Sequence, residues 1–336
     1  MLDSFLLDDH DGVQVAAAGE ALMDLIANAD GQLQPCFGGA PFNLTLALAR
    51  QGVGTLYLNP MSKDPFGLQL AAVLKNAGVY LAESHAVLAP TSLAVVNVDP
   101  QGVPTYAFYR QGVADRATSA AKLMQACAKA ENLSLVCTGG LALSPDDAEI
   151  YLPWLAGQRQ SGRTVVIDAN MRPSLMPNLD MYRRHVLTAL HYADIIKVSD
   201  GDLACLHLPG PDAMAQAIHL LQYTRASILV LTQGAKGAAL LTRHGQLFQC
   251  REVEPITVVD TVGAGDCFLA GLVSAVVEDG LAHDWGSGPV HGDVAKKLLA
   301  RAVSSASLCV LHRGCVPPTL SQVIARQAKV AMLLTG

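Results

Sequence analysis

Two hydrophobic patterns alternate along this chain. Short apolar runs rich in β-branched residues predict buried strands, and the longer stretches between them, in which apolar residues recur every three to four positions, predict helices. The expected strands are 13–18, 56–58, 133–137, 164–167, 195–198 and 228–231. This alternation favours an α/β fold in which helices cover a mostly parallel central sheet.

One segment departs from this rhythm. Polar and apolar residues alternate in 92–99 and 104–109, on either side of Pro100-Gln101-Gly102-Val103, and this pattern predicts an antiparallel hairpin. We expect residues of about 91–116, together with about 31–38, to form a small β-sheet lid. The lid would be inserted in a single domain that spans residues 1–336.

Two segments near the C-terminus show no candidate chemistry. The Gly/His-rich residues 279–293 lie between two helix-like stretches and predict a surface insertion. From Thr319 to Leu334, apolar residues recur at helical spacing, which predicts a last helix packed on the domain.

Composition narrows the class of protein. With 336 residues, 51% of them hydrophobic, the chain can bury one large core, and its apolar runs are shorter than the about 20 residues of a membrane-spanning helix. A net charge of −6 gives no basic field for nucleic acid. We therefore expect neither a membrane nor a nucleic acid as partner.

Charge and cysteine usage indicate the compartment. The first twelve residues carry four aspartates and neither lysine nor arginine, which is the wrong charge for a secretory leader. Eight cysteines occur without a Cys-x-x-Cys pair, mostly inside apolar runs, so reduced and buried thiols are expected. Both observations favour the cytoplasm.

The segment with the strongest chemical signal is Asp260-Thr261-Val262-Gly263-Ala264-Gly265-Asp266. It joins 256–259, expected as a strand end, to an apolar helix-like stretch. Asp266 should therefore lie at a helix N-terminus, where N–H groups lack partners and the helix dipole attracts anions. A carboxylate beside a bound phosphate can take a proton from an attacking hydroxyl, although a simple N-cap role would explain Asp266 equally well.

Other polar groups follow the predicted strands, at the edge where open α/β sheets bind ligands. Asp24 suits paired sugar hydroxyls, and Gly38-Gly39 with Asn43 opens a helix-like stretch. Residues 168–172 offer a carboxylate, an amide and a guanidinium, and 232–237 form a turn that could contact a nucleotide. A solvated loop acid, a helix-entry turn and a hairpin turn are the structural alternatives.

The two glycine motifs in this order, Gly38-Gly39…Asn43 and then Asp260-Thr-x-Gly-Ala-Gly-Asp266, resemble the ribokinase-like carbohydrate kinases of the phosphofructokinase-B type. The resemblance extends from about Val15 to Pro318. It implies a three-layer α/β/α domain with a small β-sheet lid. It also implies transfer of the γ-phosphate of ATP, with Mg²⁺, to a hydroxymethyl group of a small sugar.

Within that family the chain looks most like the fructokinases, because of Glu20…Asp24, Phe108-Tyr109-Arg110 and Asp168-x-Asn-x-Arg172. D-Fructose, converted to fructose 6-phosphate, is therefore the expected substrate. Ribose, 2-keto-3-deoxygluconate and a nucleoside stay open as acceptors, and an arginine pair such as Arg110 and Arg172 could also bind a sugar acid's carboxylate.

The resemblance implies a role for each matching residue. Asp266 would be the catalytic base, and the amides of Gly263, Ala264 and Gly265 would form an anion hole. The sugar would be held by Asp24, Gly38, Gly39, Asn43, Arg110, Asp168, Asn170 and Arg172. ATP would contact Ser199, Thr232, Gly234 and Gly237.

Two departures from the family pattern concern cations. Ser199-Asp200-Gly201-Asp202 stands where relatives usually have Asn-x-x-Glu, so Asp202 is expected to reach Mg²⁺ through water. Residues 311–315 end in Gly-Cys where the family commonly has Gly-Ala, near a monovalent cation that the Asp260 loop also holds. A K⁺ site at Asp260 therefore stays open.

Two alternatives to a kinase belong to other classes of protein. A nicotinamide-dependent oxidoreductase would share the βα alternation, but neither Gly-x-Gly-x-x-Gly nor Gly-x(4)-Gly-Lys-Ser/Thr occurs. A sugar-responsive regulator without turnover would not need Asp266. The exposed edges of the lid could clasp a second subunit in a homodimer, or only cover the pocket.

Overall fold

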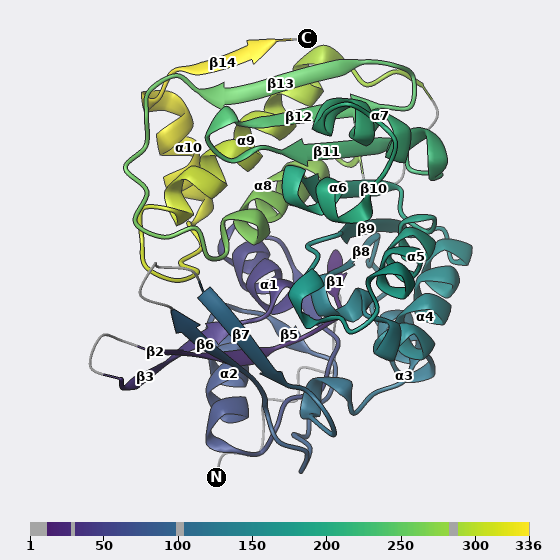
Figure 1. Cartoon of the computed structure of the whole chain (residues 1–336), viewed down its shortest axis with the longest axis vertical. Helices are drawn as coiled ribbons and strands as arrows, with labels where there is room; N and C mark the ends of the chain where they lie inside the picture. Colours follow the sequence, from purple (N-terminus) through teal and green to yellow (C-terminus); the bar gives the residue numbers. More distant parts are fainter. Residues whose placement is uncertain (1–11, 28–30, 99–103, 282–287, 336) are drawn as a thin grey trace.

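The computed structural model of this chain describes residues 12–27, 31–98, 104–281 and 288–335. A ten-stranded sheet in the order β14-β13-β12-β11-β10-β9-β8-β1-β4-β5 runs through the molecule (Figure 1). Neighbouring strands from β11 to β5 pair in parallel, whereas β12, β13 and β14 extend the sheet antiparallel. The strands are β1 (Val15–Ala17), β4 (Thr55–Tyr57), β5 (Tyr80–Leu81), β8 (Leu135–Gly139), β9 (Thr164–Asp168), β10 (Ile195–Ser199), β11 (Ile228–Thr232), β12 (Ala238–Thr242), β13 (Leu247–Glu252) and β14 (Met332–Thr335).

Helices cover both faces of this sheet. The helices are α1 (Ala40–Arg50), α2 (Pro65–Asn76), α3 (Ala120–Ala128), α4 (Ala148–Gln160), α5 (Leu179–Leu190), α6 (Asp200–Leu206), α7 (Ala213–Tyr223), α8 (Ala264–Glu278), α9 (Gly292–Cys309) and α10 (Leu320–Lys329). The apolar core on one face is completed by α3 to α7, and that on the other by α1, α8 and α9. The expected three-layer α/β/α architecture is therefore confirmed.

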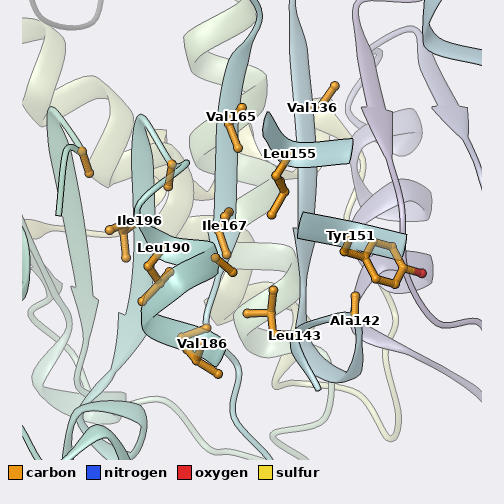
Figure 2. Close-up of a cluster of buried hydrophobic side chains, with 14 of the residues drawn as sticks. Val136, Ala142, Leu143, Tyr151, Leu155, Val165, Ile167, Val186, Leu190 and Ile196 are labelled. Atoms are coloured by element: carbon orange, nitrogen blue, oxygen red, sulfur yellow. The ribbon is translucent and has the colours of Figure 1, made fainter. Parts of the chain in front are cut away.

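The strands of the parallel part are largely apolar because both of their faces are buried. In β9, Val165 and Ile167 belong to the core on one face and Val166 to the core on the other. Figure 2 shows Val165 and Ile167 beside Leu155 of α4, with Leu190 of α5 nearby. This two-sided burial explains why each of the six predicted strands was found.

A second, four-stranded sheet in the order β3-β2-β6-β7 lies at the lower left of Figure 1. Its strands are β2 (Leu22–Ala27), β3 (Leu33–Gly38), β6 (Ser92–Val98) and β7 (Pro104–Tyr109). The predicted hairpin is confirmed, because β6 and β7 pair antiparallel; its expected tip, 99–103, lies outside the described residues. The small sheet also contains β2, which follows β1 closely and pairs in parallel with β6.

Two local predictions were wrong. Residues 256–259 form no strand: Val258 and Val259 are 53% and 61% exposed, and the backbone N–H of Val259 bonds to Val310. The C-terminal helix ends at Lys329, and Met332–Thr335 pairs with β13 as a strand.

Part of the expected surface insertion, 282–287, lies outside the described residues. None of the described helices is long and apolar enough to cross a membrane.

Candidate active site

The Asp260–Asp266 segment turns directly into the N-terminus of α8. Gly263 precedes the first helical residue with φ 76°, a left-handed conformation that favours glycine, and a Cβ at this position would collide with Sγ of Cys315. Gly263 is the N-cap, and no side chain caps this helix in the described chain. The proposal that Asp266 is only an N-cap is therefore wrong, because Asp266 is the third helical residue.

Asp266 instead contacts the other glycine motif. Asn43, in the first turn of α1, donates a hydrogen bond from Nδ2 to Oδ2 of Asp266 at 2.9 Å, and both side chains are buried. Gly39 is the N-cap of α1 with φ 103°, where a Cβ would collide with the carbonyl of Glu20. The hydrogen bond between Asn43 and Asp266 thus joins the two glycine motifs, although 223 residues separate these side chains along the chain.

Burial raises the pKa of Asp266 to about 7, although the hydrogen bond from Asn43 favours the charged form. The charge of Asp168 also raises this pKa, and the charge of Lys197 lowers it. A carboxyl that titrates near neutral pH is suited to general-base catalysis, since it can both accept and release a proton.

A cavity of about 790 Å³ opens beside these two helix ends, a volume typical of small-molecule sites. Of the residues expected in the site, it is lined by Asp24, Gly39, Asn43, Asn170, Arg172, Asp260, Gly263, Gly265 and Asp266. Glu20, Phe37, Phe108 and Arg313 also line it and were not expected there. The cavity therefore collects groups from the small sheet, from α1 and from α8.

Asp24 lies on β2 and faces this cavity. Burial raises its pKa to about 6, and the charge of Arg172 opposes that rise. Gly38, on the neighbouring strand β3, has no room for a side chain because a Cβ there would collide with Oδ2 of Asp24. Gly38 therefore leaves space for the Asp24 carboxylate.

Asn170 and Arg172 follow β9 and reach the cavity from the large sheet. Asn170 has φ 37°, which asparagine tolerates better than most residues. Nη1 of Arg172 donates to Oδ1 of Asn170 at 2.6 Å and to its carbonyl at 3.0 Å. The guanidinium thus holds the Asn170 turn while the side chain itself stays exposed.

Arg110 is not brought to the cavity. Its Nη1 lies 3.2 Å from Oδ2 of Asp147, and its Nη2 lies 3.6 Å from Oδ2 of Asp115. Arg110 therefore has two carboxylate partners, and its charge also reaches Glu20, whose pKa burial raises to about 7 against the opposing charge of Arg110. Arg110 therefore acts on the cavity through Glu20 rather than by direct contact.

A buried ion pair lies next to Gly265 in the first turn of α8, where Gly263, Ala264 and Gly265 form what we call the anion cradle, after the role expected of it. Nζ of Lys197 is 2.9 Å from Oδ2 of Asp168, and the two side chains are only 5% and 6% exposed. Nζ would also lie 2.9 Å from a Cβ built on Gly265. Desolvation lowers the pKa of Lys197, but the charges of Asp168 and Asp202 raise it more, so the lysine stays protonated.

Sequence reasoning missed Lys197. The available signal was a lone charge within the apolar run Ile195-Ile196-Lys197-Val198, since a lysine in a buried strand needs a partner. Asp168 is that partner, because the two residues are in register on β9 and β10. Oδ1 of Asp168 is buried and has no hydrogen-bond partner among the described residues.

Asp202 organises the start of α6. Its Oδ2 accepts hydrogen bonds from the backbone N–H and the hydroxyl of Ser199, at 2.8 and 2.7 Å, and its Oδ1 accepts one from the N–H of Met171 at 2.7 Å. Ser199 and Asp202 form a capping box. Neither residue lines the cavity of 790 Å³.

The residues expected to contact ATP lie at the ends of β10 and β11. Ser199 and Thr232 are in register on these strands. Gly234 has φ 54° and open space around it, whereas a Cβ on Gly237 would collide with the carbonyl of Cys250. The segment is also the turn that joins β11 to the antiparallel β12, so the hairpin-turn alternative is confirmed as its local structure.

Asp260 joins two loops at the far side of the cradle. Its Oδ1 accepts from the N–H of Val262 at 3.1 Å, and its Oδ2 accepts from the N–H of Gly314 at 2.8 Å.

All eight cysteines are free. Cys36, Cys205 and Cys315 are half-buried and the other five are buried, so most of the thiols are buried, as expected.

Comparisons with known proteins agree with this geometry. Curated fructokinases from Rhizobium leguminosarum bv. trifolii and Salmonella typhimurium are 31% and 30% identical to this chain, and the alignments cover 80% and 81% of it and 81% and 87% of those proteins. The fructokinase from Xylella fastidiosa with bound ATP superposes with a TM-score of 0.80 and 26% identity, over 95% of this chain and 99% of that one. The profile of the pfkB carbohydrate kinases matches residues 14–322, so the chain belongs to the pfkB family of carbohydrate kinases, a family of phosphotransferases.

Proposed function

We propose that this kinase transfers the γ-phosphate of ATP to D-fructose and forms fructose 6-phosphate. The observation that carries the proposal is the contact between Asn43 and Asp266, which places a carboxyl of near-neutral pKa at an uncapped helix N-terminus inside the cavity. The fructokinase names of the curated relatives support fructose as the acceptor.

Asp266 is proposed as the general base. Its carboxylate would take the proton from the primary hydroxyl of the sugar as that oxygen attacks the γ-phosphorus, and Asn43 would hold the carboxylate in place. The backbone N–H groups of Gly263, Ala264 and Gly265 and the dipole of α8 would stabilise the charge on the transferring phosphoryl group. Ala264 would have to exchange its present bond to the carbonyl of Thr261 at 3.2 Å for the phosphate.

The sugar is proposed to lie between β2 and the loop that follows β9. Asp24 would accept hydrogen bonds from two hydroxyls, Asn170 would offer both a donor and an acceptor, and Gly39 would allow close approach of the backbone. Arg172 supplies a cation at the same side of the cavity. Asp168 and Arg110 would act from behind this surface, through Lys197 and Glu20.

ATP is proposed to extend from the cradle toward the ends of β10 and β11, where Ser199, Thr232, Gly234 and Gly237 lie. Mg²⁺ would enter with the triphosphate and neutralise its charge. The structure fits a hydrated ion, since a water could donate to the unpaired Oδ1 of Asp168, whereas both oxygens of Asp202 already accept hydrogen bonds.

Three further expectations stay proposals. A K⁺ ion near Asp260 would have to share a carboxylate that already accepts hydrogen bonds from two loops. The K⁺ site is tested by comparing kcat in potassium chloride with kcat in tetramethylammonium chloride at the same ionic strength. A homodimer through the small sheet is tested by sedimentation. ATP as donor and eight free cysteines support action in the cytoplasm.

The substrate proposal is tested by measuring ADP release with D-fructose, D-ribose, 2-keto-3-deoxygluconate and a nucleoside. We expect the highest kcat/KM with D-fructose and phosphorylation at its 6-hydroxyl. A higher kcat/KM for any other acceptor would reject fructose but keep the kinase. Equal ADP release with and without every sugar would reject the kinase assignment of the cavity.

A further inference from the structure

Three of the eight cysteines converge beside the anion cradle. Cys267 lies in the first turn of α8, Cys309 ends α9, and Cys315 belongs to the loop that follows α9. Their Sγ atoms all lie within 4.8 Å of one another. Cys267 and Cys309 are buried and Cys315 is half-buried, so one side of the cluster remains reachable.

This spacing suits a metal ion. With metal–sulfur bonds of about 2.3 Å, three sulfurs around one Zn²⁺ lie about 3.8–4.0 Å apart, so small side-chain rotations would bring the three atoms to bonding distance. The carbonyl of Val262, which accepts a hydrogen bond from Sγ of Cys309 at 3.5 Å, lies at the same point. Thiolates select soft cations over the hard cations K⁺ and Mg²⁺.

Ordinary packing does not require this convergence. Buried cysteines usually behave as small hydrophobic residues, as Cys137 does inside β8. Cys315 differs, because its sulfur occupies the position that a side chain at Gly263 would need. The cluster thus forms part of the wall that sets the shape of the cradle.

We propose that Cys267, Cys309 and Cys315 form a binding site for one soft, thiophilic cation of the Zn²⁺ or Cu⁺ class, and that its occupation lowers phosphoryl transfer. Binding would release the thiol protons to solvent and form three metal–sulfur bonds, with no change of oxidation state. The binding site itself is independent of the proposed sugar, and only the effect on turnover rests on the proposed function.

The effect on turnover follows from charge and contact. Three thiolates around Zn²⁺ carry a net charge of −1, and around Cu⁺ a net charge of −2, next to groups that must bind an anionic phosphoryl group. Cys267 follows Asp266 directly in the chain, and Cys315 touches Gly263. Drawing the sulfurs together would therefore move the cradle as well as make it more negative.

The first experiment measures binding alone, with Cd²⁺ as the probe. The full chain, kept reduced with a non-thiol phosphine, should bind one Cd²⁺ and show a thiolate-to-metal charge-transfer band. The variant Cys315→Ala carries the alanine that the family commonly has at this position. Its affinity for Cd²⁺ should be at least ~10-fold lower, since losing a metal ligand costs no less than losing an outer-shell partner. Cys205→Ala is the matched control, because Cys205 is half-buried on α6 outside the cluster, and it should bind as the parent does.

The second experiment measures turnover with Zn²⁺ in the presence of excess Mg-ATP. We expect Zn²⁺ to inhibit the parent and Cys205→Ala, and a chelator to reverse this inhibition. At the same zinc concentration Cys315→Ala should be inhibited less. Because ATP binds the same amount of zinc in each assay, this comparison between variants also controls for zinc bound to ATP. Absence of the charge-transfer band, or equal Cd²⁺ affinity of the parent and Cys315→Ala, would overturn the site. Inhibition reversed by reductant but not by chelator would show a disulfide instead and would also overturn it.

Discussion

Replacing Lys197 by methionine should leave Asp168 as a buried charge without its partner. Nζ and Oδ2 are 2.9 Å apart, and neither side chain is more than 6% exposed, so solvent screening cannot replace the lost contact. Removing one member of such a pair costs about 3–5 kcal/mol of unfolding free energy. We therefore expect Lys197→Met to lower the unfolding free energy by about that amount at neutral pH.

The matched control is the double variant Lys197→Met with Asp168→Asn. It removes both charges and keeps similar volumes, and such replacements are often neutral or stabilising, so its unfolding free energy should lie within about 1 kcal/mol of the parent or above it. Urea unfolding of the parent, both single variants and the double variant completes a double-mutant cycle.

The deficit of Lys197→Met should also depend on pH. Burial raises the pKa of Asp168 to about 6 even with the lysine present, and removing the lysine raises it further. A carboxyl whose folded pKa lies above its unfolded value binds more protons in the folded state, so stability falls as pH rises between the two values. Below about pH 6 the parent and the variant lose stability alike, and above it only the variant goes on losing stability, so the deficit should be smallest below about pH 6 and grow as the pH rises beyond that value. A deficit below about 1 kcal/mol at neutral pH, or one independent of pH, would refute the argument that Lys197 balances a buried charge.

Three other predictions concern catalysis. Asp266→Asn should keep the fold and ATP binding and lower kcat by at least ~10²-fold, and unchanged turnover would remove Asp266 from the mechanism. In the parent enzyme, kcat/KM should rise with pH through about 7, because the base must be ionised and its pKa is raised to about 7; a profile flat from pH 5 to 9 would contradict this. Gly38→Ala should displace the Asp24 carboxylate and raise KM for the sugar more than it lowers kcat. Its control is Gly292→Ala, whose added methyl only makes ordinary contact with Phe248.

The large sheet could be predicted because its parallel strands are buried on both faces. In runs such as 164–167 every residue is buried and all but Thr164 are apolar, so the pattern can be recognised without knowing the partners. Strand β13 was missed because it alternates buried with exposed residues at the antiparallel end of the sheet. The pattern predicts a helix for the whole tail because Leu334 continues the helical spacing, although this residue is half-buried in a strand and pairs with Cys250. Valines 258 and 259 are β-branched but exposed, which no local pattern distinguishes from a strand.

The site could be predicted only where its signal lies within one short segment of the sequence. The helix N-terminus before Asp266 followed from its own glycines and the apolar stretch behind it. The contact between Asn43 and Asp266 was not predicted; the family resemblance assigned both residues to the site, but 223 residues separate the two side chains along the chain. Lys197 and Asp168 meet because of the register of β9 and β10, and register depends on how the whole sheet assembles.

Burial and the charges around the cradle together raise the pKa of Asp266 to about 7. Asp168, Asp202 and Asp266 face a single buried cation, Lys197, and each of the three charges raises the pKa of that lysine. Desolvation is the largest cause of the raised pKa of Asp266, and the charge of Asp168 adds to it against the opposing charges of Lys197 and Arg172. In the proposed reaction the same negative charges would oppose a bound triphosphate, so the dipole of α8 and Mg²⁺ would offset them. The near-neutral pKa of Asp266 and the proposed need for a divalent cation would therefore follow from the same buried, negatively charged surroundings.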